Sequence, residues 1–247
     1  NVFDFQSHNG DIQIVDLAQH RNTRFTFNAA LESFSAWSPD GNSLIFDSNR
    51  EGPFNLYQKP TRSNGEETLL LRSSHNKSPC DSSRDGKFLL YQEYAVQRIQ
   101  SDLWVLPLSG KQEPVLFLKS EFNEWGGSFS PDVRWVAYVS DESGQNEVYI
   151  RSFQAPTAQL VASKGSISGE QKQVSISGGD SPHWRRDGKE MYYFSPDNKM
   201  MAADITVKDG SLEVSHVRPL FDVPSIVQLF GSEYDVTSDG KRFLINV

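Results

Sequence analysis

One turn signature recurs five times along this chain and constrains its fold more than any other feature. Each copy centres on an aspartate, and the copies are Ser38–Gly41, Ser83–Gly86, Ser130–Val133, Arg185–Gly188 and Thr237–Gly240. Successive aspartates are 45, 47, 55 and 52 residues apart. A period of this length, with several short strands per unit, is typical of a β-propeller. Helical repeats need apolar residues at a spacing of 3.6, whereas this chain alternates apolar and polar residues.

The chemistry of the turn explains its composition. Proline favours the second position, aspartate suits the third, and glycine adopts the left-handed conformation that closes a hairpin with a bulge. Val133 stands where the other four copies have glycine. A β-branched residue at positive φ carries strain of about 1–3 kcal/mol. We therefore predict that Val133 has negative φ and that its turn differs from the others.

An apolar strand follows each turn, and it carries a large side chain at the sixth position after the aspartate. These residues are Phe46, Tyr91, Tyr138, Tyr193 and Ile245. Aromatic and β-branched residues fill the space between sheets that stack face to face. We interpret these positions as core.

The repeat predicts an all-β fold, a β-propeller of four-stranded antiparallel blades, as a single domain over residues 1–247. The expected blades span 30–74, 75–120, 121–177 and 178–224, and a composite or partial blade combines 1–29 with 225–247. This closure gives five blades and leaves no open edge. Both ends offer a second strand, however, and the chain starts without methionine. Part of a six- or seven-bladed propeller in a longer protein is therefore the alternative.

Charge and cysteine content exclude several classes of function. The formal charge is −8, whereas a nucleic-acid surface needs clustered Lys and Arg. A single cysteine excludes an internal disulfide and a cysteine-rich metal site. No apolar run approaches the roughly 18 residues of a membrane span. Any attachment to a membrane would come from parts of a parent protein that this chain lacks.

Motifs for catalysis are missing from the sequence. There is no Gly-x-Ser-x-Gly elbow, and there is no Gly-rich phosphate loop with the kinase signatures. None of the five histidines pairs with another histidine or cysteine at the spacing of metal ligands. We therefore expect no catalytic residue, no cofactor and no metal, and we expect that this chain is not an enzyme by itself.

The repeated Trp/Phe-Ser-Pro-Asp-Gly turn and the later Asp-Leu/Val-Tyr/Trp-Val/Ile strand resemble the Trp-Asp-like repeats of the TolB-type propeller family. The resemblance covers essentially the whole chain, and its motifs are specific for fold rather than activity. Three segments also resemble the C-terminal propellers of bacterial, including acidobacterial, transmembrane serine/threonine protein kinases. These segments are Gly178–Tyr193, Pro219–Phe221 and Tyr234–Val236.

The resemblance implies an extracytoplasmic sensor or scaffold domain that binds a protein, peptide or small molecule. A kinase domain would then lie in a separate part of the parent protein. One alternative is a periplasmic scaffold like TolB. Another is a metal-dependent polysaccharide lyase, a propeller that places histidines on a metal, for which His75 and His183 are the histidines to consider.

Charged residues recur where the chain enters the first strand of each blade, about eight residues before the turn aspartate. We expect four carboxylates and one lysine to ring the mouth of the pore and to favour a cation or a basic peptide terminus. Trp125 lies beside two glycines at this mouth and could stack on a sugar or peptide. The predicted ligand-binding residues are Glu32, Lys77, Glu124, Trp125, Asp180, His183 and Glu233. The alternative is that these are solvated loop charges.

Overall fold

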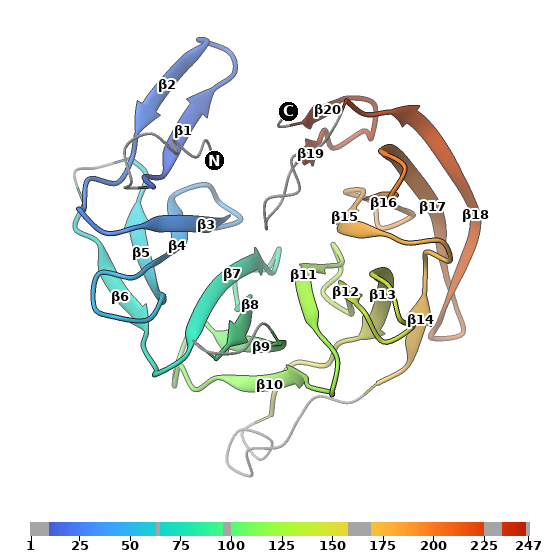
Figure 1. Ribbon diagram of the computed structural model, residues 1–247, viewed down its shortest axis with the longest axis horizontal. Coiled ribbons are helices and arrows are strands. Elements are labelled where there is room, and N and C mark those ends of the chain that lie inside the picture. The colour runs from blue at the N-terminus through green and yellow to red at the C-terminus, as the bar shows by residue number, and fades with distance from the viewer. Residues whose placement is uncertain (1–9, 63–64, 96–99, 158–168, 225–233, 246–247) are drawn as a thin grey trace. The chain divides into compact units, whose positions relative to one another are not determined.

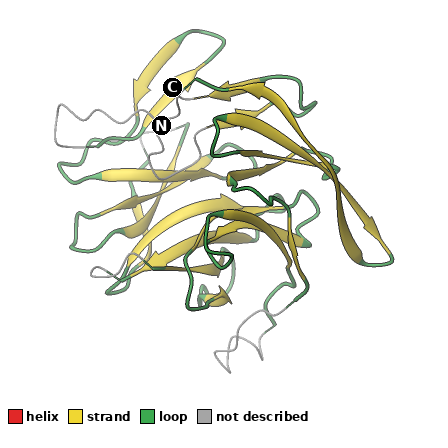
Figure 2. Ribbon diagram, turned by 45° about the vertical axis from the view of Figure 1, so that its right-hand side comes forward, coloured by secondary structure: helices red, strands yellow, loops and turns green. Residues whose placement is uncertain are grey.

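The computed structural model describes residues 10–62, 65–95, 100–157, 169–224 and 234–245. Within these residues, every regular element is a β-strand (Figure 2). The chain divides into two compact units. The first unit comprises residues 1–79 and 93–99, and the second comprises residues 80–92 and 100–247.

The first unit contains a two-stranded hairpin and a four-stranded sheet. The hairpin pairs β1 (Gln13–Asp16) with β2 (Arg21–Arg24). The sheet follows chain order and consists of β3 (Glu32–Trp37), β4 (Ser43–Ser48), β5 (Asn55–Pro60) and β6 (Thr68–Leu71). Ile12, Leu44, Phe46 and Tyr57 form the buried core of this unit.

The second unit contains two complete four-stranded sheets and a two-stranded sheet (Figure 1). One sheet consists of β11 (Glu124–Phe129), β12 (Trp135–Ser140), β13 (Glu147–Ser152) and β14 (Gln171–Gln173). The next consists of β15 (Asp180–Trp184), β16 (Glu190–Phe194), β17 (Lys199–Lys208) and β18 (Ser211–Asp222). The two-stranded sheet pairs β19 (Tyr234–Val236) with β20 (Phe243–Ile245).

A further four-stranded sheet contains the point at which the chain divides. It consists of β7 (Asn76–Ser82), β8 (Phe88–Tyr94), β9 (Ser101–Pro107) and β10 (Val115–Leu118). Most of this sheet belongs to the second unit, and residues 76–79 and 93–94 belong to the first. All four complete sheets have successive strands side by side, which is the topology of a propeller blade. Each sheet lies within one of the expected blade ranges, and the composite blade stays a prediction.

Stacking of sheets explains why the second strands are apolar on both faces. In the second unit, every residue of β12 and of β16 is buried. One apolar cluster joins β8, β9 and β10 to β11, β12 and β13, and another joins β12 and β13 to β15, β16, β17 and β18. Burying one large apolar side chain contributes about 1.5–3 kcal/mol. Each sheet is therefore stable mainly through its neighbours.

The turn at Val133 corrects one prediction. Val133 has a φ of +58°, close to the +68° of Gly41 in the first copy, so the expected negative value is wrong. Its N–H donates to the carbonyl of Ser130 at 2.9 Å, as in the glycine-containing turns. The Ser130 hydroxyl also donates to Asp132 at 2.7 Å. These bonds hold the left-handed backbone without a glycine.

Candidate functional site

The first strand of each sheet has one position, four residues before the turn aspartate, that is polar in four of the five repeats. This position forms a column of residues, which are Ala36, Asp81, Ser128, His183 and Asp235. The last four residues belong to the second unit and lie on β7, β11, β15 and β19. Equivalent positions of successive sheets thus bring hydroxyl, carboxyl and imidazole groups to one level of the second unit.

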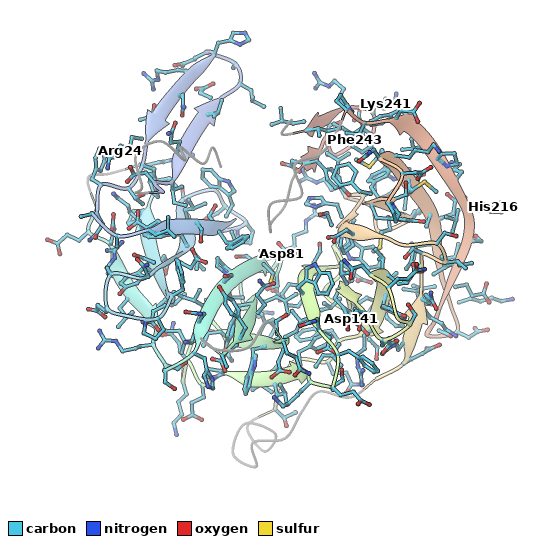
Figure 3. All side chains as sticks on the ribbon, in the orientation of Figure 1. Arg24, Asp81, Asp141, His216, Lys241 and Phe243 are labelled. Atoms are coloured by element: carbon cyan, nitrogen blue, oxygen red, sulfur yellow. The ribbon has the colours of Figure 1, made fainter. Side chains whose placement is uncertain are left out.

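Asp81 is partly buried and joins β7 to β11. Its Oδ2 accepts a hydrogen bond from the Phe129 backbone N–H at 2.8 Å. Burial raises the pKa of the Asp81 carboxyl to about 6, while the Phe129 N–H, the charge of His183 and the Ser128 hydroxyl act in the opposite direction. Figure 3 labels Asp81 beside β7. This carboxyl therefore changes charge near neutral pH.

His183 joins this group to β19. Its Nε2 lies 3.5 Å from Asp235 Oδ1, and its ring centroid lies 5.4 Å from that of Tyr234. The interaction with His183 lowers the pKa of the Asp235 carboxyl. The side chains of His183 and Asp235 are 30% and 77% exposed, so a ligand in solvent can reach both.

Asp180 and Trp125 extend the group on β15 and β11. A bulge interrupts the pairing of β15 with β16 at this point, and Ser181 has a φ of +55°. The Ser181 N–H donates to Asp180 Oδ1 at 2.6 Å. Burial raises the pKa of the Asp180 carboxyl, and hydrogen bonds from Ser181 and Trp125 oppose this shift. A β-bulge redirects side chains and is frequent beside functional sites.

Asp180 also interacts electrostatically with Tyr234, so these contacts and interactions connect six residues, which we name the inner cluster. They are Asp81, Trp125, Asp180, His183, Tyr234 and Asp235. The cluster has three carboxyl groups, one imidazole and two aromatic rings. Cationic groups bind to carboxylates and to aromatic faces, so the inner cluster suits an ammonium or guanidinium group.

Three of the predicted ligand-binding residues belong to the inner cluster, namely Trp125, Asp180 and His183. Glu32, Lys77 and Glu124 instead have side chains that are almost completely buried. Glu233 lies outside the described residues. The expected ring of charges stays a prediction.

The buried charges have partners beside their own strands, which sequence reasoning missed. Glu32 forms an ion pair with Arg50. Lys77 Nζ donates to the His75 carbonyl at 2.7 Å, and burial lowers its pKa. Glu124 accepts a hydrogen bond from the Ser120 hydroxyl. These side chains turn into the sheet because partners there replace part of the water they would lose.

Asp81, Tyr234 and Asp235 are the inner-cluster residues that the prediction omitted. Asp81 and Asp235 fall in the same column as His183, four residues before the turn aspartate. This column contains two carboxyl groups and one imidazole, although the first strands that carry it are otherwise rich in core residues. The alignment of the repeat therefore carried a signal that points to this site.

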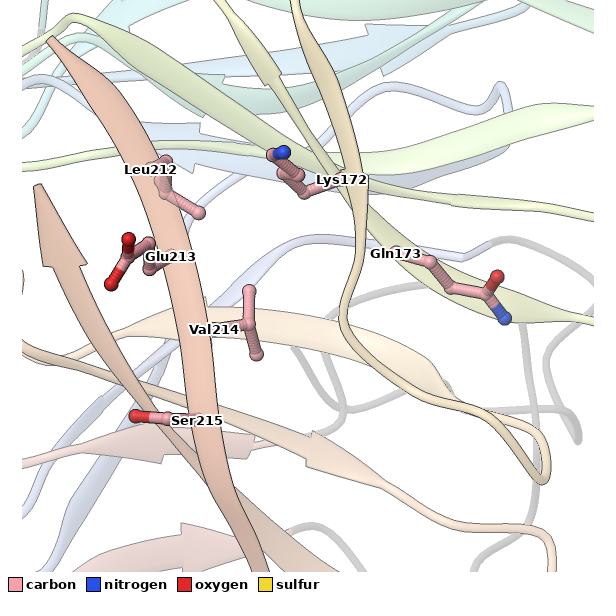
Figure 4. Close-up of a pocket in the computed structure, with 6 residues that line it drawn as sticks. All are labelled: Lys172, Gln173, Leu212, Glu213, Val214 and Ser215. Carbon is pink, nitrogen blue, oxygen red and sulfur yellow. The ribbon is translucent and has the colours of Figure 1, made fainter.

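Two hollows lie elsewhere on the second unit. One, of about 360 Å³, lies between β14 and β18 beside Lys172, Gln173 and Val214 (Figure 4). A larger cleft of about 770 Å³ lies between the turn-side edges of the β11–β14 and β15–β18 sheets, beside Trp135 and Trp184. Neither hollow includes a residue of the inner cluster.

A metal site was tested against the geometry of the described residues. They contain no group of three or more His, Cys, Asp or Glu side chains that could hold a metal ion. His75 lies in the first unit, where its Nδ1 is 3.2 Å from Glu93. The described residues also include no helix with the length and apolar character of a membrane span.

Comparisons with known proteins identify the fold. No protein-family model matches the chain. An uncharacterized protein of Agrobacterium fabrum is 24% identical over 161 residues, which are 64% of this chain and 52% of that protein. The chain is similar to TolB from Acinetobacter baumannii, with 17% identity, a TM-score of 0.60, and coverage of 82% of this chain and 47% of TolB. It thus spans about half the length of both proteins.

Two enzymes also have similar structures. The Pseudomonas aeruginosa periplasmic gluconolactonase has a TM-score of 0.61 and 14% identity over 95% of this chain and 71% of its own. An oligogalacturonate lyase in complex with manganese has a TM-score of 0.62 and 14% identity over 95% of this chain and 67% of its own. Together with the antiparallel four-stranded sheets, these likenesses confirm the predicted all-β propeller fold, and TolB-like propellers are among its structural neighbours.

The comparisons also correct one expectation. We expected that the chain is not an enzyme, because it lacks familiar catalytic motifs. That inference is wrong, because propellers described as a gluconolactonase and as a lyase share this fold. Propeller enzymes gather their active residues from several blades, so a short sequence motif is not required for activity. The fold alone therefore does not assign a role, because it occurs in TolB as well as in proteins described as a lyase and a gluconolactonase.

Proposed function

We propose that this chain is a binding propeller whose second unit holds a cationic group of a peptide or protein at the inner cluster. The observation that carries the proposal is that His183 lies 3.5 Å from Asp235 and interacts electrostatically with Asp81, which joins the first strands β7, β15 and β19. Trp125, which is partly exposed, adds an aromatic face beside these charges, and the buried Tyr234 ring packs against His183. Rigid strands hold the groups in place, and this limits the entropy lost on binding.

The excess of carboxyl groups over the imidazole sets the ligand charge that the inner cluster prefers. The inner cluster contains three carboxyl groups, those of Asp81, Asp180 and Asp235, and one imidazole, so it favours positive charge once the carboxyl groups are ionised. A basic side chain can contact the exposed Asp235 first and then approach the aromatic rings. This order of contact suits an extended peptide rather than a large anionic sugar.

The biological setting that we propose is a sensor or scaffold on the outer side of the bacterial cytoplasmic membrane. Similarity to TolB and to a periplasmic gluconolactonase supports this setting. The finer proposal is that the chain is the sensor domain of a membrane-bound serine/threonine kinase, and the segments Gly178–Tyr193, Pro219–Phe221 and Tyr234–Val236 support it. A periplasmic scaffold like TolB is the alternative in the same class.

Calorimetric titration with decalysine tests the binding proposal. We expect wild-type protein to bind decalysine saturably and not to bind decaglutamate. Asp235→Asn removes an exposed charge with little change of shape, and it should weaken decalysine binding about tenfold, as for loss of a close charge pair. Binding should also weaken at high salt.

The matched control is Asp197→Asn, which removes an exposed carboxylate on the β16–β17 hairpin. This variant should bind decalysine like the wild type. Equal weakening by Asp197→Asn and Asp235→Asn would show that overall charge, rather than the inner cluster, attracts the peptide.

A further inference from the structure

The buried glutamates at one repeat position, Glu32 and Glu124, differ in how their charge is balanced. In the first unit, the Arg50 guanidinium forms an ion pair with Glu32 and lies 4.2 Å from the centroid of the Tyr57 ring. It also lies 5.8 Å from the Phe46 ring, and its Nε donates to Ser48 Oγ at 3.0 Å. Glu32, two stacked rings and one hydroxyl thus surround a guanidinium, and Glu67 forms a second ion pair with it.

The β11–β14 sheet repeats these surroundings. By register from the turn aspartate, Glu124, Tyr138, Ser140 and Tyr149 correspond to Glu32, Phe46, Ser48 and Tyr57. The Tyr138 and Tyr149 rings stack at 5.9 Å and 24°, and Phe46 and Tyr57 stack at 6.1 Å and 25°. The aromatic platform is therefore the same in both repeats.

The cation itself is not repeated. Glu142 occupies the position of Arg50, ten residues after the turn aspartate. The Gln171 amide donates to Glu142 Oε1 at 2.5 Å, which holds this side chain at the edge of the platform. A carboxylate in this position reverses the charge that the first repeat provides.

Glu124 is consequently a buried acid among other acids. Its side chain is 1% exposed, and its Oε2 has no hydrogen-bond partner among the described residues. Burial raises the pKa of Glu124 to about 7, and nearby Asp102, Asp141 and Glu142 raise it further. The Ser120 hydroxyl opposes this shift.

The cations near this site are engaged with other groups. Lys119 Nζ lies 2.5 Å from Asp102. Arg151, on β13, donates to Gln171 at 3.3 Å. Among the described residues, none forms an ion pair with Glu124. The β11–β14 sheet therefore repeats the carboxylate and the aromatic platform, but its own guanidinium, that of Arg151, interacts with Gln171 and Tyr138 rather than with Glu124.

We propose that Glu124 and the Tyr138–Tyr149 platform form a binding site for a guanidinium group from an arginine of another molecule. The incoming guanidinium takes the position that Arg50 has in the first repeat, and Glu142 moves aside or binds it as a second carboxylate. Guanidinium groups pair with carboxylates in a planar fork and stack on aromatic faces, which matches both parts of this site.

Methylguanidinium is the probe that tests this site. Carbon-13 NMR of labelled glutamate carboxyls would follow Glu124 during titration with methylguanidinium at pH 7.5. We expect saturable binding that lowers the pKa of Glu124. Glu124→Gln keeps the shape and should weaken binding at least about tenfold, because the charged hydrogen bonds are lost. Glu213→Gln, on exposed β18, is the control and should bind like the wild type.

A second variant rebuilds the arrangement of the first repeat. Glu142→Arg places a guanidinium of the chain itself beside Glu124, so it should raise the melting temperature and abolish methylguanidinium binding. Asp235→Asn should leave this binding unchanged, which separates the site from the inner cluster. Equal binding by wild type and Glu124→Gln, or no saturable binding to the wild type, would overturn the proposal. Glu124→Gln decides the question even where Glu142→Arg does not fold.

Discussion

The β3–β6 sheet of the first unit and the β11–β14 sheet of the second unit treat the buried glutamate at one repeat position in opposite ways. In the first unit, Glu32 pairs with Arg50, and Glu67 pairs with Arg50 and Lys59. In the second unit, Glu124 has carboxylates as its charged neighbours, and the exposed Asp235 has one partly exposed histidine, whereas the buried Glu190 pairs with Arg185 and Arg218. The sheets themselves have the same topology and the same aromatic stack. The difference therefore lies in the charges rather than in the fold.

This contrast shows where the chain has capacity to bind. Paired buried charges in the first unit satisfy one another and serve stability. Acid groups without cations in the second unit gain most from a ligand that supplies positive charge. Sheets of the same topology can thus serve stability in one unit and ligand binding in the other. Exchange of one residue, Arg50 for Glu142 at the same repeat position, accounts for much of the change.

Removing the cation from the first unit is the change with the largest expected effect. Arg50→Met keeps much of the side-chain volume but leaves Glu32 and Glu67 without their guanidinium. We expect the free energy of unfolding, measured with urea, to fall by about 3 kcal/mol, because a buried carboxylate loses its partner. Arg72→Met breaks an exposed pair with Glu51 and should cost at most about 0.5 kcal/mol. Similar losses for both variants would contradict the contrast.

The pH dependence of stability sharpens the comparison for the second unit. Glu124 has a pKa of about 7, above its ordinary value of 4.5, so the folded state favours the protonated form. The contribution of Glu124 to the free energy of unfolding is fully present below about pH 4.5 and is lost as the pH rises through 7. After allowance for screening, we expect a loss of about 1–2 kcal/mol between pH 5 and pH 8.5.

Urea unfolding of the wild type and of Glu124→Gln at pH 5 and pH 8.5 measures this loss. Glutamine stays neutral, so the difference between the two proteins should be larger at pH 8.5 and should favour the variant. A difference that does not change with pH would show that Glu124 is already charged at pH 5.

Substitutions in the turns have the smallest expected effect on the free energy of unfolding. Val133→Gly should relieve left-handed strain in the second unit and raise the free energy of unfolding by about 0.5 kcal/mol, since some packing is lost. The converse change, Gly41→Ala, adds a Cβ that has open space but an unfavourable φ, so it should cost about 1 kcal/mol. Thermal unfolding of both variants checks the opposite signs. Stabilisation by Gly41→Ala would contradict this account of the turns.

Much of the fold could be predicted from the sequence, because hairpin chemistry and strand alternation are local. The repeated turns located four complete sheets and placed Phe46 and Tyr138 in the core. The conformation of Val133 could not be predicted in this way. Its positive φ depends on the hydrogen bonds that the Ser130 hydroxyl and the Arg134 N–H donate to Asp132, which outweigh the preference of a β-branched residue.

The candidate site was only partly predictable. Charges at the start of each first strand suggested a solvent-facing group, but Glu32 and Glu124 turn into their own sheets. Side-chain direction beside a β-bulge is not visible in a local pattern, and a bulge follows each of these residues. The column that contains Asp81, His183 and Asp235 was visible once the repeats were aligned.

Backbone NMR during titration with decalysine tests the central claim, that cationic groups bind to the second unit. We predict that saturable shifts of amide signals concentrate at residues 125–129, 180–184 and 234–236, and that residues 32–60 change little. Shifts that concentrate in the first unit, or that spread evenly over all exposed carboxylates, would contradict the claim.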